Sequence, residues 1–261
     1  MLPASAGYLD DVQEETPSLG EPVTNRPREA REGVRGGPPD IAPTALARVV
    51  VRPIANPFAL GFLGLAGATL VLAGQELAWI PSRQTLEVAV IILIAAPVLQ
   101  LIACVFGFLG RDPVAATGMG TLAATWGAIG VVHALSPPDA PSQALGTLLF
   151  LSAAGVLLSA LLAAETKLLP AAVMALTAGR FFTTGLYEVT GNQAIKAAAG
   201  VVGCLLTALA VYAAFALELE GVQHRSVLPT FRRGSGKRLL YRGLGEQLRT
   251  VAGEPGVRTE L

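Results

Sequence analysis

The stretch Asn56-Pro57-Phe58-Ala59-Leu60-Gly61 opens the first long apolar run of the chain. No charged residue lies between Arg52 and Glu76, and this segment is long enough for the ~20 helical residues that a bilayer core needs. Proline is tolerated in the first turn of a helix, and the asparagine before it can accept a hydrogen bond from a free backbone N–H. The pair Asn56-Pro57 therefore predicts the start of a membrane helix at the bilayer edge.

Small residues follow this start at steps of three and four. They are Gly61, Gly64, Gly67 and Ala68, and in lipid such a face lets a neighbouring helix approach closely. We expect a buried helix face here.

The composition is that of a membrane protein. The chain has 261 residues, of which 52% are hydrophobic and 15% are charged, whereas soluble domains carry about 25% charged residues. The formal net charge is zero, so no partnership with nucleic acid is predicted. Cys104 and Cys204 lie inside apolar runs and fit neither a disulfide framework nor a zinc site. No metal or cofactor is expected.

Six apolar runs separated by short polar turns predict six transmembrane helices in an all-α bundle. The expected spans are 53–75, 88–110, 114–135, 143–164, 168–187 and 194–217. The turn at 111–113 is so short that the second and third spans should form a hairpin. We therefore divide the chain into three parts. Residues 1–52 form a Pro/Gly-rich tail that is predicted to be disordered, residues 53–221 form the six-helix transmembrane domain, and residues 222–261 form a basic tail.

The even number of spans predicts that both tails lie on one side. Basic residues near span ends mark the cytoplasmic side. Arg48 and Arg52 precede the first span, further basic residues follow the last, and the loop 136–142 has no Lys or Arg. We therefore predict a multi-pass plasma-membrane protein with both termini in the cytoplasm. Its basic C-terminal tail is either solvated or in contact with anionic lipid.

Polar residues inside the spans fall on helical stripes. The third span repeats a threonine every fourth position and the fifth has polar residues three or four apart: Thr117, Thr121 and Thr125, and Thr177, Arg180, Thr184 and Tyr187. Polar groups at membrane depth usually face the bundle interior or a wet cavity. Such stripes can line a narrow path, although a membrane threonine often only bonds the carbonyl one turn back. Gln100 has two interpretations, pore lining or a hydrogen bond between helices.

Arg180 lies near the middle of the fifth span. A cation at this depth needs a partner, which we expect to be a protein carboxylate, a backbone end or a substrate. Glu188 lies two turns away, a rise of ~12 Å along the helix, which is long for a direct pair. A guanidinium presents a planar fork that fits a carboxylate. Two interpretations stay open: a fixed positive site for an organic anion, or a contact that holds the fifth helix.

These residues resemble the acetate uptake (acetate/succinate–proton symporter) family. The stretch that starts at Asn56 is similar to the family's Asn-Pro-Ala-Pro-Leu-Gly signature, with Phe58 and Ala59 in place of Ala and Pro. Three further segments continue the resemblance, which covers about residues 53–231: Pro97-Val98-Leu99-Gln100-Leu101-Ile102-Ala103, Tyr187-Glu188-Val189-Thr190-Gly191-Asn192 and Val227-Leu228-Pro229.

The resemblance implies a six-helix protomer with its own central pore, assembled as a homo-hexamer. It implies movement of acetate, other small monocarboxylates or succinate, together with protons. It also implies a constriction, which in the family is formed by a Phe of the first helix, a Tyr of the third and a Leu of the fifth. These positions correspond to Leu65, Leu122 and either Leu176 or Thr177, so the two aromatic residues are absent here. The substrate-binding and pore-lining residues are therefore expected to be Asn56, Leu60, Leu65, Gln100, Thr121, Leu122, Thr125, Leu176, Thr177, Arg180 and Thr184.

The favoured function is a membrane transporter, proton-coupled or channel-like, for a small organic anion, with a proton, lipid and further copies of the chain as partners. Glu188 is the candidate for proton coupling, since partial burial at a helix end can raise the pKa of a carboxyl group; a solvated loop acid is the alternative. An enzyme is not expected, because Ser152 and Ser159 have no deep histidine or paired carboxylates near them in sequence. A non-transporting membrane sensor or assembly protein on the same fold is the alternative.

Overall fold

The computed structural model describes residues 55–223 and 227–232 of the chain. The predicted disorder of the tail 1–52, its basic residues Arg48 and Arg52, and most of the basic tail 222–261 lie outside these described residues. The predictions about the tails therefore stay predictions.

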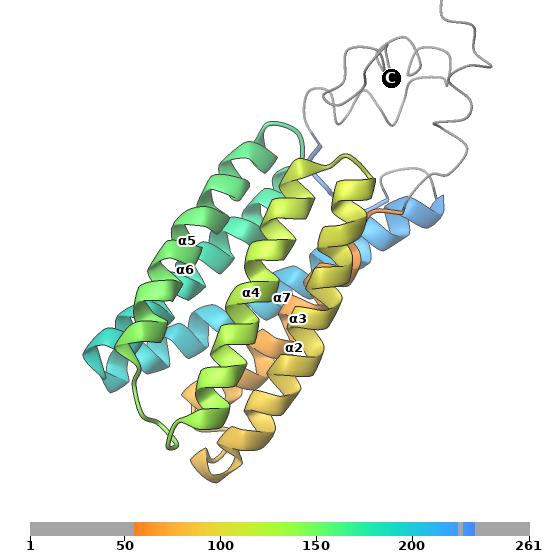
Figure 1. The fold of residues 1–261 in the computed structure, drawn as a ribbon. Helices are drawn as coiled ribbons and strands as arrows, with labels where there is room; N and C mark the ends of the chain where they lie inside the picture. The colour runs from red at the N-terminus through yellow and green to blue at the C-terminus, as the bar shows by residue number, and fades with distance from the viewer. Residues whose placement is uncertain (1–54, 224–226, 233–261) are drawn as a thin grey trace, which may run out of the picture. The chain divides into compact units, whose positions relative to one another are not determined.

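Six α-helices make up the described part of the chain (Figure 1). Their bounds are α2 Phe58–Glu76, α3 Thr85–Leu109, α4 Pro113–Leu135, α5 Gln143–Ala164, α6 Leu168–Thr190 and α7 Gln193–Gln223, and the 3-10 turn η1 Ser82–Gln84 precedes α3. Five of them are long and apolar enough to cross a membrane. The helix α6 has similar length but is more polar, because it carries Arg180, Glu188 and several threonines. The all-α prediction is confirmed.

The predicted helix ends follow from local hydrogen bonds. Asn56 Oδ1 accepts a hydrogen bond of 3.1 Å from the backbone N–H of Phe58, so the Asn-Pro pair starts α2 as expected. Asp112 does the same for α4, accepting from the N–H of Ala115 at 3.0 Å. At the other end of a helix, Gly191 closes α6 with a φ of 66°, a left-handed conformation that glycine adopts without strain.

The helices form a closed ring. Each helix packs on the next one along the chain, and α7 packs back on α2. Short turns join consecutive helices, so neighbours in the ring run antiparallel (Figure 1). We call the end with the loop 136–142 the loop end, and the end where α2 begins and α7 finishes the tail end.

Large side chains fill the middle of the ring. Each of the following residues is 1% exposed or less: Phe62, Leu65, Met119, Leu122, Trp126, Met174 and Phe181. The rings of Trp126 and Phe181 pack edge to face with centroids 5.8 Å apart. The axis of the predicted pore is therefore occupied by side chains in this conformation. Large apolar side chains are also exposed on the outside of the ring, as at Ile94, Leu151 and Phe215, which suits contact with lipid.

The glycines of α2 allow close helix packing inside one chain. A Cβ on Gly64 would lie 2.9 Å from the carbonyl oxygen of Ala95 in α3, and one on Gly61 would lie 2.4 Å from Sδ of Met119 in α4. The expected close approach is confirmed. Because these neighbours belong to the same ring, Gly61 and Gly64 give no local support to an interface between protomers.

Candidate functional site

A small charged cavity lies at the loop end of the ring. Its volume is about 30 Å³, room for one or two water molecules. Residues from α2, α4, α6, α7 and the loop 136–142 line it, and those that titrate are Glu76, His133, Asp139, Tyr187, Glu188 and Lys196. Six ionisable side chains from five segments therefore meet at one mouth of the ring.

Arg180 lies behind this cavity and is held by an ion pair. Its Nη2 donates to Oε2 of Glu76 at 2.6 Å, and the two side chains are 1% and 5% exposed. Nη1 donates to Oγ1 of Thr184 at 2.5 Å, whereas Nε has no hydrogen-bond partner among the described residues. The arginine faces the interior as predicted, and its partner is a protein carboxylate.

The sequence did not identify this partner. Glu76 is the last residue of α2, and 104 positions separate it from Arg180. The two meet because the ring closes: α7 packs against both α2 and α6. A Cβ on Gly203 of α7 would lie 3.1 Å from Arg180 Nε and 2.9 Å from Cβ of Ala73. A glycine at this position of α7 therefore leaves the room that the guanidinium occupies.

Polar contacts of two acidic residues, Asp139 and Glu188, hold the loop 136–142 over the cavity. Asp139 pairs with Lys196 of α7 at 2.5 Å and accepts a hydrogen bond of 2.5 Å from Ser82. The hydrogen bond from Lys196, together with the one from Ser82, holds the pKa of the Asp139 carboxyl below its ordinary value. Oε2 of Glu188 accepts a hydrogen bond of 2.7 Å from the backbone N–H of Ser142. Glu188 is 3% exposed, so the alternative of a solvated loop acid is wrong.

The predicted constriction residues point into the core. Leu65, Leu122 and Thr177 are fully buried, whereas Leu176 is only partly buried. Of the two predicted positions on α6, Thr177 is therefore the one that lies in the core.

Among the predicted site residues, Gln100 stands out because its side chain forms no hydrogen bond within the described part of the chain. Its side chain is fully buried, and neither polar atom of its amide has a hydrogen-bond partner in the described part of the chain. Gln100 therefore forms no hydrogen bond between helices in the described part of the chain, and pore lining stays a prediction.

Most hydroxyl groups of the predicted threonine stripes form hydrogen bonds within their own helices. Thr121, Thr125, Thr177 and Thr184 each donate to the carbonyl four residues earlier. The hydroxyl of Thr125 also lies 2.8 Å from that of Ser152 in α5. These hydroxyls thus bond the carbonyl one turn back, which was the alternative interpretation of the stripes, and Thr125 also joins α4 to α5.

Leu60 lies outside the core, contrary to the prediction that it lines the pore. Its side chain is 37% exposed, and it lines an apolar groove of about 860 Å³ on the outer surface between α2, α3 and α7. Asn56 lines the same groove. The helical turn that buries Phe62 and Leu65 necessarily directs Leu60 to the other face.

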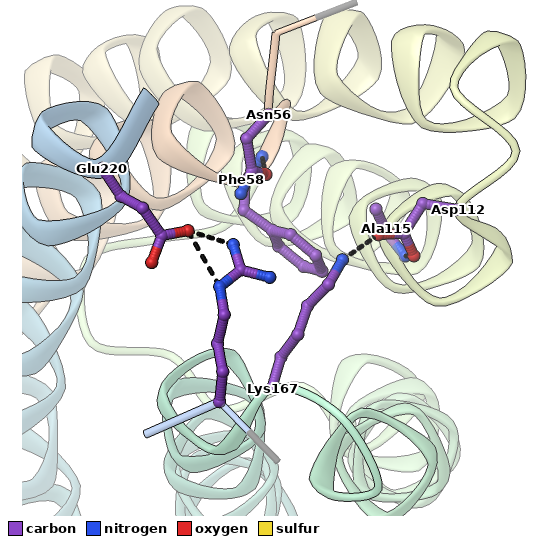
Figure 2. Close-up of polar contacts among 7 residues, drawn as sticks. Asn56, Phe58, Asp112, Ala115, Lys167 and Glu220 are labelled. Atoms are coloured by element: carbon purple, nitrogen blue, oxygen red, sulfur yellow. Dashed lines mark hydrogen bonds and ion pairs between the residues drawn. The ribbon is translucent and has the colours of Figure 1, made fainter. Parts of the chain in front are cut away.

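The tail end is closed by a second set of ion pairs (Figure 2). Lys167 Nζ pairs with Oδ2 of Asp112 and lies 5.3 Å from the centroid of the Phe58 ring. Phe58, which replaces an alanine of the family signature, thus makes a cation–π contact with the Lys167 ammonium group. Glu220 near the end of α7 pairs with Arg232 and accepts a hydrogen bond of 2.9 Å from Thr230. The segment 227–232 therefore folds back on the ring at this end.

Comparison with known proteins identifies the family. The model of the GPR1/FUN34/yaaH family matches residues 39–231. The chain belongs to the GPR1/FUN34/yaaH family. This assignment confirms the resemblance to acetate uptake transporters that starts at Asn56. No curated protein sequence matches the chain.

A solved structure with the same fold is among those that match this GPR1/FUN34/yaaH protein. It is the structure of the bacterial acetate channel SatP, which matches with a TM-score of 0.60 and 21% sequence identity, covering 67% of this chain and 98% of that one. At this identity the likeness shows the fold. Together with the apolar helices, it supports a multi-pass membrane protein, and the matched structure is a channel, not an enzyme.

Proposed function

We propose that this chain moves acetate or another small monocarboxylate across the plasma membrane, as a channel or as a proton-coupled transporter. The observation that carries the proposal is the fixed positive charge of Arg180, buried inside a closed ring of helices directly behind a charged cavity. An organic anion loses its hydration when it enters a membrane protein, and a buried guanidinium offsets part of that cost. Membership of a family whose fold is that of an acetate channel supports this substrate class.

The path is proposed to follow the axis of the ring. Gln100, Leu65, Leu122 and Thr177 would line it, because all four are fully buried in the core. The amide of Gln100 would supply polar contacts that the surrounding leucines lack. In the conformation described here the cavity has room only for water and the axis is filled, so transport requires side chains or helices to move.

The remaining parts of the proposal come from the sequence. The protein is proposed to be a homo-hexamer with both termini in the cytoplasm, and its substrate to be accompanied by a proton. Glu188 was the sequence candidate for this proton. Its carboxylate already accepts a hydrogen bond from the N–H of Ser142, just before the start of α5, which suits a loop anchor as well as a proton acceptor.

Uptake into proteoliposomes tests the function. Purified protein is reconstituted and supplied with radiolabelled acetate, lactate or succinate, with and without an inward proton gradient. Empty liposomes correct for passive permeation of the undissociated acids. We expect protein-dependent uptake of at least one of these anions. Absence of protein-dependent uptake under both conditions would contradict transport and favour the alternative of a membrane sensor or assembly protein.

A further inference from the structure

We propose that Glu76 is an internal competitor for the substrate carboxylate on Arg180, and that it releases the arginine by taking up a proton. This step rests on the proposed function and gives it a mechanism for coupling. It assigns Glu76 as the proton-carrying residue of the site and Arg180 as the residue that binds the anion.

The geometry places Glu76 between the cavity and the arginine. Glu76 lines the loop-end cavity, whereas Arg180 is buried behind it and is 1% exposed. Oε2 of Glu76 holds Nη2 of Arg180 at 2.6 Å. An anion that arrives through the loop-end mouth therefore meets the Glu76 carboxylate before it can contact the guanidinium.

The guanidinium of Arg180 has unused binding capacity. Glu76 contacts it through one oxygen, and Nε has no partner among the residues that the structure describes. A carboxylate bound to arginine favours two parallel N–H···O bonds. An acetate or lactate carboxylate could thus replace the Glu76 carboxylate on the guanidinium of Arg180. It would accept the same charge-assisted hydrogen bond from Nη2 that Glu76 accepts.

Charge balance then ties the proton to the anion. With Glu76 ionised, the pair is neutral. When an organic carboxylate binds Arg180, Glu76 accepts one proton from hydronium in the solution at the loop end, relayed through water in the cavity. An O–H bond forms on the Glu76 carboxyl group, the hydronium is left as water, and the site is neutral again. Binding without this proton would leave one uncompensated negative charge in the bundle, which is costly at membrane depth. One proton therefore accompanies each anion.

The other charged groups around Glu76 are engaged elsewhere. Lys196 of α7 pairs with Asp139 of the loop, and Glu188 of α6 accepts from the Ser142 N–H. Nδ1 of His133 in α4 lies 2.9 Å from the carbonyl oxygen of Ile129. On α2 and α3 the neighbouring side chains, Gln75 and Thr85, are neutral and bond each other. Glu76 is thus the carboxylate in direct contact with Arg180.

The test compares proton dependence in matched variants. The full chain is reconstituted in proteoliposomes with an entrapped pH dye, and radiolabelled acetate uptake and internal acidification are measured together. Glu76→Gln replaces the titrating carboxyl group with a neutral amide of the same size. Glu87→Gln makes the same change at an exposed position near the loop end and serves as the control.

We expect the wild type and Glu87→Gln to take up acetate faster with an inward proton gradient and to carry one proton with each acetate. In Glu76→Gln, acetate exchange should continue, but uptake with and without the gradient should become equal. Arg180→Gln should take up no acetate. The Glu76→Asp variant, which keeps the carboxyl group, should retain the gradient dependence with a slower rate.

The outcomes separate this inference from the proposed function. If wild-type liposomes take up none of the tested anions, the function itself fails. If the wild type transports acetate and Glu76→Gln keeps the full gradient dependence, the function stands and the role of Glu76 is wrong. If Glu76→Gln does not fold, the wild-type measurement still decides, because acetate uptake without accompanying protons would overturn the proposal.

Discussion

Gln100 combines a buried amide with a proposed place on the transport path. Its amide is fully buried without a hydrogen-bond partner in the described chain, and an unsatisfied buried polar group costs about 1–3 kcal/mol. We expect Gln100→Leu to raise the melting temperature, because the side chain keeps its approximate size and loses its unpaired atoms. We also expect slower anion uptake, because the path loses its amide.

The control for Gln100 is Gln143→Leu, at an exposed position at the start of α5. This surface change should alter stability by no more than about 0.5 kcal/mol and leave uptake unchanged. Thermal unfolding in detergent and liposome uptake measure both effects. A less stable Gln100→Leu would show that the amide is satisfied in the native protein, and unchanged uptake would remove Gln100 from the path.

The pair Arg180–Glu76 makes a second prediction for single residues. The variant Arg180→Leu leaves Glu76 buried at 5% exposure without its partner. Removing one member of a buried pair destabilises a protein by about 3–5 kcal/mol, whereas replacing both with apolar residues can be neutral. The double variant Arg180→Leu/Glu76→Leu should therefore unfold at a higher temperature than Arg180→Leu. Equal melting temperatures would mean that Glu76 finds water or another partner.

At the level of the helices, α2 depends on glycine where it meets α3. A Cβ on Gly64 would lie 2.9 Å from a backbone oxygen of α3, which cannot move as a side chain can. We expect Gly64→Ala to destabilise the protein by about 1–3 kcal/mol, as overpacked cores do. The matched control is Gly179→Ala in α6, where a Cβ would meet no atom within 4 Å. It should be neutral or stabilising by about 0.5–1 kcal/mol, since alanine is the better helix residue.

Thermal unfolding of the two alanine variants checks this contrast. Similar melting temperatures would mean that α2 and α3 can separate without loss of stability, and the ring would then be looser than the distances imply.

The helices themselves could be predicted from the sequence because their signals are local. Apolar runs, the Asn56 cap and the prolines and glycines of the turns fixed all six elements, and the bounds of α5 agree at both ends. The contact between Glu76 and Arg180 could not be predicted. It depends on α7 closing the ring between α2 and α6, which leaves no periodic pattern in the sequence. Leu60 was misplaced for a related reason, because a motif gives the residues of a helix start without the direction in which each one points.

For the molecule as a whole, buried or half-buried ion pairs lie at both ends of the ring. The loop end has the acidic and basic residues of the cavity, with Glu76 and Arg180 beneath them. The tail end has Lys167 on Asp112 and Arg232 on Glu220. Between them the core is apolar and filled. If Glu76 receives the proton, the direction of coupled transport depends on which side of the membrane the loop end faces.

The orientation can be decided by cysteine labelling. The loop 136–142 has no Lys or Arg, and basic residues favour the cytoplasmic side, so the loop end is predicted to face outward. A cysteine in place of Asp139 would break the ion pair with Lys196. Two other exposed positions are therefore better reporters: Ala140 at the loop end and Arg111 at the tail end.

With Cys104 and Cys204 replaced by alanine, an impermeant maleimide added to intact cells should label Ala140→Cys and not Arg111→Cys. Both should react after the membrane is permeabilised, which controls for access to each site. The same result would direct the Glu76 carboxyl toward the external proton pool, so that an acidic exterior drives anion uptake. The reverse labelling pattern would place the Glu76–Arg180 cavity on the cytoplasmic side. Coupled transport would then respond to internal rather than external protons.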